Sequence, residues 1–254
     1  MAVEWIAHRG ASFDAPENTL AAIRLAWKQG SDATEIDVHL SRDGHLVAIH
    51  DATTLRTGGR DRPVREQSLA ELKELDVGSW KDARWIGERI PTLSEVLAIL
   101  PSDKRLFIEI KSAPQTVPML CETLRRSSSL PNQIAVIGFS LSTLRLARRV
   151  FGESNWGDCS VEWCWEIRSP PCDARAWGAK AERCLELARR AGMTGLDLCA
   201  DVAMDVDFVD RVHAAGMWLD VWTVDDVSLA KQLIAAGVDG ITTNKPGALR
   251  AACE

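Results

Sequence analysis

The stretch ATEIDVHLSRDGHLVAIHD, residues 33–51, decides the fold class. It contains two short runs of mostly apolar or β-branched residues, at 33–38 and 46–49, and each has the length and composition of a strand. The seven residues between the runs are too few for the helical crossover that joins two parallel strands. The stretch is therefore predicted to fold as an antiparallel hairpin.

The turn of this hairpin is indicated by Asp43-Gly44, a dipeptide typical of two-residue β-turns. A two-residue turn centred on this dipeptide would place Asp37 directly opposite His50. The expected register therefore brings a carboxylate beside an imidazole.

Outside the hairpin, strand-like runs alternate with amphipathic helical stretches, which is typical of parallel α/β folds. Further strands are expected at residues 3–8, 106–111, 134–140, 157–163, 195–199, 218–224 and 240–243. Helices are expected to begin at Pro16 and at Thr92, and to span 68–75, 117–126, 142–150, 176–191, 206–215 and 227–236. This gives nine strand candidates where a barrel has eight, and the surplus is expected within the hairpin.

The length of 254 residues is that of one (β/α)₈ barrel. We therefore predict an α/β protein with the TIM (β/α)₈ fold, as a single domain over residues 1–254. Residues 51–88 interrupt the alternation with a Gly-Gly pair, a proline and many charges. They are predicted to form a small insertion after the third strand.

Composition excludes several classes of protein. The net charge is −6 and the pI about 5.5, so neither a nucleic-acid partner nor stable membrane association is expected. The N-terminus has no signal-peptide pattern, the seven cysteines form no Cys-x-x-Cys pair, and reduced thiols in the cytoplasm are expected. An acidic protein that binds an anionic small molecule must concentrate cations or a metal at one site.

Polar residues stand where four of the predicted strands end. The four segments are His8-Arg9-Gly10, Glu35-Ile36-Asp37, His50-Asp51 and Glu109-Ile110-Lys111. In a β/α barrel these strand ends meet at the active face. Residues two apart in a strand share one face, and buried charges there are costly unless they are paired or bind a metal. Three carboxylates, Glu35, Asp37 and Glu109, predict one divalent cation, Mg²⁺ or Ca²⁺ rather than zinc.

The remaining groups of this set suit a phosphate ester. Arg9 and Lys111 can bind the phosphate and spread its charge. His8 and His50 can serve as catalytic acid and base, one taking a proton from the attacking oxygen and the other giving one to the leaving oxygen. The residue types do not indicate which histidine has which role.

Several motifs run in the order found in one known family, and together they span residues 6 to 246. They are His8-Arg9-Gly10, Pro16-Glu17-Asn18-Thr19, Glu35-Ile36-Asp37-Val38, Asp43-Gly44, His50-Asp51, Ile90-Pro91-Thr92-Leu93, Glu109-Ile110-Lys111, Trp222-Thr223-Val224 and Gly240-Ile241-Thr242-Thr243-Asn244. In these motifs the chain resembles the glycerophosphodiester phosphodiesterases, most closely their compact bacterial cytoplasmic members. The chain differs from the family at Arg56-Thr57-Gly58-Gly59, where the family usually has Arg-Thr-Thr-Gly. Residues 152–201 resemble the family poorly.

The resemblance implies a metal-dependent hydrolase on a TIM barrel with the insertion at 51–88. It implies a cation at Glu35, Asp37 and Glu109, catalysis by His8 and His50, and phosphate binding by Arg9 and Lys111, which are the positions that match the family's motifs. The expected products are sn-glycerol 3-phosphate and an alcohol such as choline or ethanolamine. A cyclic phosphate formed by a substrate hydroxyl and direct attack by water both remain open.

Four further residues are expected around this site. Asp51 is interpreted as orienting a neighbouring side chain, and Glu17 as fixing the first helix to the barrel. Asn244, at the end of the last strand, is expected to act in the same way. Trp222 is expected either to stack on the substrate or to pack in the core.

Three alternatives compete with this interpretation. The first is a lysophospholipase D acting on single-chain lipids, with Trp80, Trp85 and Ile86 as an apolar entrance. The second is a non-catalytic barrel that binds phosphorylated ligands. The third is an aldolase-type barrel with Lys111 as a Schiff-base lysine. The oligomeric state is not indicated by any pattern.

Overall fold

The barrel predicted from the sequence is confirmed. The structure is a computed structural model that describes residues 2–112, 114–166, 174–201 and 204–254; Cys172, one of the cysteines expected to be reduced, lies outside them. The strands are β1 (Glu4–Ala7), β2 (Ala33–Leu40), β3 (Leu46–Ala48), β4 (Arg105–Ile110), β5 (Ile134–Gly138), β6 (Ser160–Trp165), β7 (Gly195–Cys199), β8 (Trp218–Trp222) and β9 (Gly240–Thr243).

Eight of these nine strands close into a ring. Their order is β1-β9-β8-β7-β6-β5-β4-β2, all pairs are parallel, and β1 also pairs with β2. β3 pairs with β2 alone, in antiparallel sense, and lies outside the ring. The surplus strand is therefore where the sequence predicted it.

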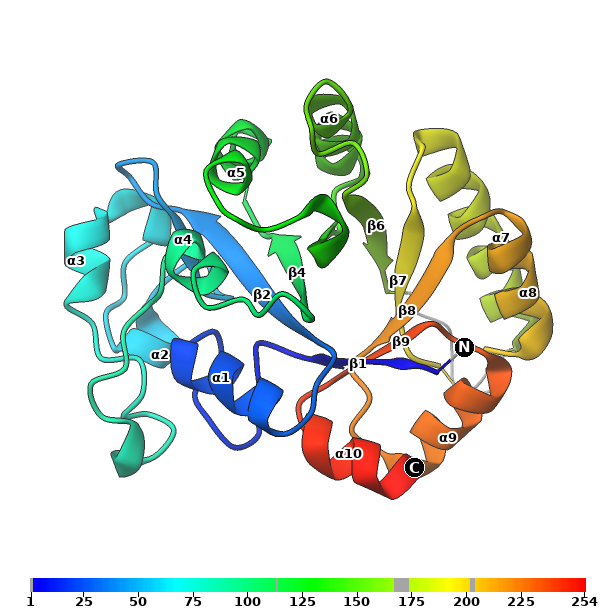
Figure 1. Cartoon of the computed structure of the whole chain (residues 1–254), viewed down its shortest axis with the longest axis horizontal. Coiled ribbons are helices and arrows are strands. Elements are labelled where there is room, and N and C mark those ends of the chain that lie inside the picture. The colour runs from blue at the N-terminus through cyan, green and yellow to red at the C-terminus, as the bar shows by residue number, and fades with distance from the viewer. Residues whose placement is uncertain (1, 113, 167–173, 202–203) are drawn as a thin grey trace.

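Helices surround the strands (Figure 1). They are α1 (Leu20–Lys28), α2 (Leu55–Gly58), α3 (Leu69–Lys73), α4 (Leu93–Leu97), α5 (Thr116–Arg125), α6 (Leu141–Gly152), α7 (Ala174–Ala191), α8 (Val206–Ala214), α9 (Val227–Ala236) and α10 (Pro246–Cys253), with short 3₁₀ turns η1 (Val64–Glu66), η2 (Ala83–Trp85) and η3 (Pro131–Gln133). No helix among the described residues is long and apolar enough to cross a membrane.

The register predicted for the hairpin is wrong by one residue. Val38 pairs with Ala48, and the backbone N–H of Ile49 donates to the carbonyl oxygen of Asp37 at 3.0 Å. The connection is a three-residue loop, in which Gly44 adopts φ +84° and its N–H donates to Ser41 at 3.1 Å. A loop of this length with a left-handed glycine replaces the expected two-residue turn. Ile49, not His50, therefore lies opposite Asp37.

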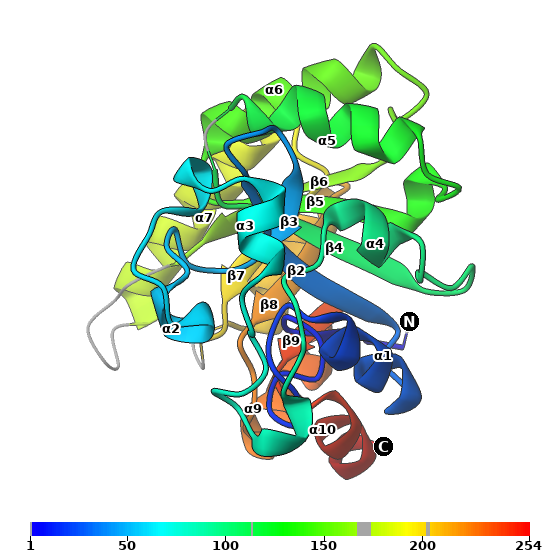
Figure 2. The same ribbon diagram turned by 90° about the vertical axis from the view of Figure 1, so that its left-hand side faces the viewer.

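Residues 51–88 lie beside β3, and Figure 2 shows α2 and α3 on this side of the barrel. Their apolar side chains pack with residues of β3 and its surroundings in a hydrophobic cluster separate from the main core. Its members are Val47, Ile49, Val64, Leu72, Leu75, Val77 and Ile90. α3 begins at Ser68 with a capping box that Glu71 completes. The segment thus packs on the hairpin that it follows.

The start of the first helix differs from the prediction. α1 begins at Leu20, with Thr19 as N-cap, and not at Pro16. The Thr19 hydroxyl accepts from Ala22 N–H at 3.2 Å and donates to the Pro16 carbonyl oxygen at 2.7 Å. Ser, Thr, Asp and Asn satisfy the first free N–H groups of a helix, which proline cannot do. Residues 16–19 consequently form a turn against the barrel.

The last helix, α10, was not predicted. It is short, begins with Pro246 at its first turn and buries only Pro246 and Leu249. Two buried residues give too weak a periodic signal to distinguish a helix from a tail. The helix predicted to begin at Thr92 is confirmed: Thr92 is the N-cap of α4, and Glu95 completes a capping box.

Candidate active site

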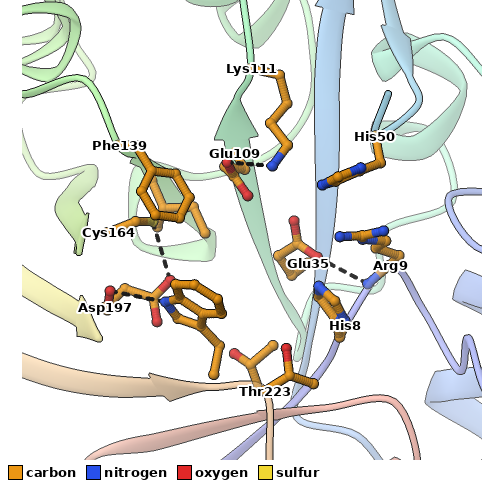
Figure 3. A pocket seen from close by; sticks show the side chains of 13 residues that line it. His8, Arg9, Glu35, His50, Glu109, Lys111, Phe139, Cys164, Asp197 and Thr223 are labelled. Atoms are coloured by element: carbon orange, nitrogen blue, oxygen red, sulfur yellow. Dashed lines mark hydrogen bonds and ion pairs between the residues drawn. The ribbon is translucent and has the colours of Figure 1, made fainter. Parts of the chain in front are cut away.

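A pocket of about 290 Å³ opens at the carboxyl ends of the barrel strands (Figure 3). Its lining residues are His8, Arg9, Glu35, His50, Glu109, Lys111, Ile137, Phe139, Cys164, Asp197, Trp222, Thr223 and Thr242. They come from both ends of the chain and from the hairpin. Seven of the predicted site residues, His8, Arg9, Glu35, His50, Glu109, Lys111 and Trp222, are therefore brought together around one cavity.

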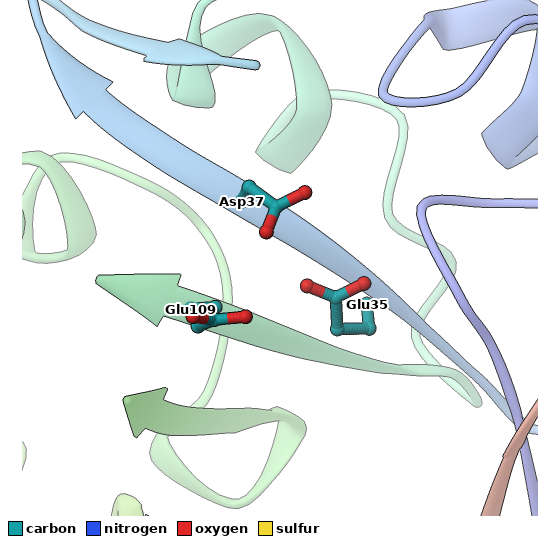
Figure 4. Close-up of side chains that lie close together, drawn as sticks. All are labelled: Glu35, Asp37 and Glu109. Atoms are coloured by element: carbon teal, nitrogen blue, oxygen red, sulfur yellow. The ribbon is translucent and has the colours of Figure 1, made fainter. Parts of the chain in front are cut away.

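Three carboxylates lie together at the base of this region, and we call them the first acidic trio: Glu35, Asp37 and Glu109. Asp37 and Glu109 are partners in the register of β2 and β4, and Glu35 lies two residues before Asp37 on the same face. One oxygen from each lies within 4.8 Å of the others (Figure 4). All three are buried. The alternation of strand residues thus produces the cluster.

Two cations partly neutralise the first acidic trio. Arg9 Nε lies 3.1 Å from Asp37 Oδ2, and Lys111 Nζ lies 3.3 Å from Asp37 Oδ1 and 2.8 Å from Glu109 Oε1. Burial would raise the pKa of Asp37, but Arg9 and Lys111 outweigh it and hold that pKa below its usual value. Burial and the nearby charge of Asp37 raise the pKa of Glu35 well above its usual value. When all three carboxyl groups are ionised, the two cations leave one negative charge uncompensated, and the raised pKa of Glu35 reflects the cost of that charge.

The chemistry of the first acidic trio fits a divalent metal ion. Glu35 Oε1 is buried and has no hydrogen-bond partner among the described residues. An unpaired buried carboxylate oxygen is costly, and a cation would remove that cost. Because all the candidate ligands are carboxylate oxygens, Mg²⁺ and Ca²⁺ suit the site better than zinc.

Left-handed backbone positions shape this part of the site. Arg9 has φ 57° and Asn18 has φ 58°. Arg9 N–H donates to Glu35 Oε2 at 2.9 Å. The Asn18 amide donates to Asp37 Oδ2 at 2.7 Å and accepts from Asp37 N–H at 3.1 Å. Non-glycine residues seldom adopt this conformation, and it is often found at functional sites.

Asn18 is a residue of the site that the sequence interpretation does not single out. In the sequence it appears only as part of a motif, yet its side-chain amide donates to Asp37, a carboxylate of the first acidic trio. Its place in the Pro16-Glu17-Asn18-Thr19 motif was the available signal.

His8 is held by the last strand. Its Nδ1 lies 2.8 Å from Asn244 Oδ1, and the Asn244 amide donates to Asp225 Oδ2 at 2.6 Å. An amide oxygen accepts a hydrogen bond, so Nδ1 carries the hydrogen and Nε2 is left as the acceptor in the neutral ring. Burial lowers the pKa of His8, which favours this neutral form. Asn244 is thus the neighbour that orients His8.

His50 stands at the start of a chain of ion pairs. Its Nδ1 lies 2.7 Å from Asp51 Oδ1, and Arg56 Nε binds Asp51 Oδ2 at 2.7 Å. Arg56 also binds Glu17 at 2.8 Å, and Glu17 binds Arg9 at 2.9 Å. These ion pairs join both sides of the pocket rim: Asp51 contacts His50, and Glu17 contacts Arg9 and Arg56. Arg56 was noted only for its loop and not as a site residue.

Trp222 lines the pocket and is fixed by its neighbours. Its indole N–H donates to the Asp197 carbonyl oxygen at 3.1 Å, and its ring packs edge-to-face on Phe139 with centroids 5.6 Å apart. Phe139, Cys164 and Asp197 were missed, because each is a lone residue of its type in a strand or loop without a spacing motif.

The environment of Lys111 argues against the aldolase alternative. Asp37 and Glu109 outweigh the opposing effect of burial and raise the pKa of Lys111. A Schiff-base lysine needs a lowered pKa to be a nucleophile at neutral pH. Lys111 therefore remains an ammonium group, suited to binding an anion.

The fold and this pocket define a TIM-barrel hydrolase of phosphate esters. The model of the glycerophosphoryl diester phosphodiesterase family matches residues 8–155 and 170–248. A glycerophosphodiester phosphodiesterase of Caldanaerobacter subterraneus subsp. tengcongensis is 32% identical over 251 residues, which cover 96% of this chain and 95% of the relative. The chain therefore belongs to the glycerophosphodiester phosphodiesterase family of enzymes, and the non-catalytic alternative is set aside.

Solved structures agree with this assignment. An Oleispira antarctica phosphodiesterase, in complex with the product sn-glycerol 3-phosphate, has a TM-score of 0.81 and 31% identity, covering 98% of this chain and 96% of that one. A glycerophosphodiester phosphodiesterase of Agrobacterium tumefaciens has a TM-score of 0.79 and 25% identity, covering 98% of this chain and 100% of that one.

Proposed function

We propose that this enzyme hydrolyses glycerophosphodiesters to sn-glycerol 3-phosphate and an alcohol, with one divalent cation, Mg²⁺ or Ca²⁺, held by Glu35, Asp37 and Glu109. The observation that carries the proposal is the first acidic trio, buried, within 4.8 Å and beside two histidines of the same pocket. When bound, the cation would neutralise charge on the phosphoryl oxygens. The product bound to the Oleispira antarctica phosphodiesterase supports the choice of substrate.

His8 and His50 are the proposed acid and base. The neutral ring of His8, with Nδ1 on Asn244, leaves Nε2 to accept a proton from the attacking oxygen. His50, hydrogen-bonded to Asp51, is then the group that gives a proton to the leaving alcohol. The attacking oxygen is either that of water or a neighbouring hydroxyl of the substrate.

Arg9 and Lys111 are the proposed phosphate ligands. Both line the pocket, and both are already oriented by carboxylates of the first acidic trio. Preorganised cations of this kind stabilise the charge that develops in the transition state without reorganising during the reaction.

The test is release of glycerol 3-phosphate from glycerophosphocholine in the presence of Mg²⁺, Ca²⁺ or EDTA. We expect release that depends on a metal and falls by on the order of 10³-fold or more in His8→Ala and in Glu35→Ala. No release from folded wild type with any metal, or release that neither substitution affects, would show that the proposal is wrong.

The lysophospholipase D alternative receives less support from the geometry. Trp80 and Ile86 are exposed, but neither belongs to the described residues that line the pocket. The same assay with lysophosphatidylcholine separates the two substrates: turnover of the lipid above that of glycerophosphocholine would favour the alternative.

We also propose that residues 1–254 form one domain with an insertion at 51–88. The support is the small hydrophobic cluster that the insertion forms on β3, which could not be retained without the hairpin. Limited proteolysis should therefore cut within 51–88 before it cuts the barrel. Release of a stable fragment that divides the barrel would contradict a single domain.

A further inference from the structure

The pocket has two chemically different halves. One half is charged and contains His8, Arg9, Glu35, His50, Glu109 and Lys111. The opposite half is formed by Ile137, Phe139, Cys164, Asp197, Trp222 and Thr223. Figure 3 shows Phe139, Cys164 and Asp197 across the cavity from Arg9 and His50. Among the described residues that line this opposite half, Asp197 is the only carboxylic acid.

One carboxyl oxygen of Asp197 is buried without a hydrogen-bond partner among the described residues. Asp197 lies on β7 and is 4% exposed. Oδ2 accepts from the Cys164 thiol at 3.4 Å, whereas Oδ1 has no hydrogen-bond partner among the described residues. A buried polar atom without a partner is uncommon in a folded protein and often indicates a missing ligand or water. The position in the pocket wall makes a ligand the simpler explanation.

The surroundings of Asp197 favour a neutral acid. Among the described residues it forms no ion pair with a lysine or arginine. Burial, with repulsion from Glu162, raises the pKa of Asp197 well above its usual value. A protonated carboxyl group both donates and accepts a hydrogen bond, as an alcohol does, so it is matched to a hydroxyl group and not to an ammonium ion.

Two aromatic rings stand beside this acid. Trp222 is fixed by the bond of its indole N–H to the Asp197 carbonyl oxygen, and Phe139 packs edge-to-face on Trp222. Aromatic faces pack well against C–H groups. A carbon chain that carries a hydroxyl at its far end suits this arrangement, with rings along the chain and the carboxyl group at the hydroxyl.

We propose that Asp197 is a specificity-determining residue that binds the terminal hydroxyl of the glycerol moiety, the hydroxyl farthest from phosphorus. This inference rests on the proposed function, because it places the phosphate in the charged half. The other glycerol hydroxyl is next to the phosphoester and stays near the charged half, whereas the terminal one reaches across the cavity. Asp197 thus selects glycerol esters over esters that lack this hydroxyl.

The test compares kcat/KM for glycerophosphocholine with kcat/KM for the phosphocholine diester of propane-1,2-diol, which lacks only the terminal hydroxyl. Wild type should prefer the glycerol ester by on the order of 10- to 100-fold. Asp197→Leu, which removes the polar group at similar size, should abolish most of the preference through loss on the glycerol ester alone. Asp197→Asn should keep most of it.

The matched control is Asp220→Asn, which changes another buried acid of the same barrel that does not line the pocket. Its preference should equal that of wild type. If Asp197→Leu does not fold, Asp197→Ala carries the same expectation. A folded Asp197→Leu or Asp197→Ala with an unchanged preference overturns the proposal, and so does a change confined to the choice of leaving alcohol.

Calorimetry of ligand binding separates this inference from the proposed function. Wild type should bind sn-glycerol 3-phosphate more tightly than propane-1,2-diol phosphate, and Asp197→Leu should bind the two equally. Such a result in a protein without diesterase activity would support the binding site while contradicting the proposed function. Diesterase activity with equal binding of the two ligands by wild type would contradict the binding site alone.

Discussion

The barrel contains two groups of three buried carboxyl groups, and they differ in their neighbours. The first acidic trio, on β2 and β4, is paired with Arg9 and Lys111. The second acidic trio consists of Glu162, Asp197 and Asp220, on β6, β7 and β8. Among the described residues its members form no ion pair with a lysine or arginine. Burial raises the pKa of Asp197 and of Asp220 well above the usual value.

Glycines make room for the second acidic trio. A Cβ at Gly240 would lie 2.3 Å from Asp220 Oδ1, and a Cβ at Gly195 would lie 2.8 Å from Glu162 Cγ. Glu162 Oε2 and Asp220 Oδ1 are both buried without a hydrogen-bond partner among the described residues, and burial together with the charge of Glu162 raises the pKa of Asp220.

The comparison teaches that burial alone does not decide the charge of a carboxyl group. Cations close to the first acidic trio keep Asp37 ionised, so the trio can bind a metal ion. Without a neighbouring cation, burial raises the pKa of Asp197 and of Asp220 and so favours their neutral forms. Functional interpretation of buried acids therefore depends on the neighbouring positive charges.

The largest expected effect separates the two trios directly. Glu35→Gln should lower kcat/KM for glycerophosphocholine by on the order of 10³-fold, because it removes a ligand of the proposed cation. Asp220→Asn should change kcat/KM by less than about threefold, since Asp220 does not line the pocket and the amide has nearly the same size as the carboxyl group. Steady-state kinetics at saturating Mg²⁺ measure both. Equal losses of kcat/KM in Glu35→Gln and Asp220→Asn would contradict the functional distinction between the two trios.

A substitution at Lys111 makes the first acidic trio more like the second, because it removes a neighbouring cation. Lys111→Met removes one of its two cations and a proposed phosphate ligand, so kcat/KM should fall by on the order of 10²-fold. Metal affinity should not fall, because a positive charge beside the metal ion has been removed. Kinetics and metal titration of the same preparation give the two values. Loss of metal binding along with activity would show that Lys111 acts on the metal site.

The raised pKa of Asp220 predicts a dependence of stability on pH. The folded pKa of Asp220 is raised, so its stabilising contribution is complete below the pKa of an unfolded Asp, about 3.9, and is lost as pH rises toward the folded pKa. Asp220→Asn removes this loss. The free energy of unfolding of wild type should therefore fall more steeply above pH 5, by at most about 1.4 kcal/mol per pH unit.

Urea unfolding of wild type and Asp220→Asn at several pH values, in EDTA, measures this difference. The raised pKa of Glu35 contributes equally to both proteins and cancels. Parallel curves for the two proteins would mean that Asp220 titrates alike in the folded and unfolded states.

The smallest expected effect concerns the ion pairs at the rim. Arg56 is 41% exposed and joins Asp51 to Glu17, so water screens its contribution. Arg56→Gln should change kcat/KM by only about two- to fivefold. The same kinetics in low and high salt test this, because high salt should reduce the difference between the variant and wild type. A loss as large as that of Glu35→Gln would place Arg56 in the catalytic machinery.

The first acidic trio could be predicted from the sequence, and the second could not. Glu35-Ile36-Asp37 and Glu109-Ile110-Lys111 each place two charges on one face at the end of a strand, a pattern that strand geometry makes readable. Glu162, Asp197 and Asp220 stand singly in three strands. Only closure of the barrel brings them together, so no local spacing identifies them.

The fold was predicted from the alternation of strand-like and helical stretches and from the length of the chain. The predictions that were wrong concern details that depend on single residues. The left-handed Gly44 made the hairpin loop one residue longer than its Asp-Gly pair indicated, which moved His50 past Asp37. His50 still lines the pocket, because the chain after β3 turns back over the strand ends. The contacts of Asn18 and Arg56 depend on tertiary packing that periodicity does not report.

The central claim is that the first acidic trio, and not the second, binds the divalent cation. Isothermal titration of metal-free protein with Mg²⁺ and with Ca²⁺ tests it most directly, for wild type, Glu35→Gln and Asp220→Asn. We predict one site in wild type and in Asp220→Asn, and at least a tenfold weaker site in Glu35→Gln. Unchanged binding in Glu35→Gln, or loss of binding in Asp220→Asn, would contradict the claim.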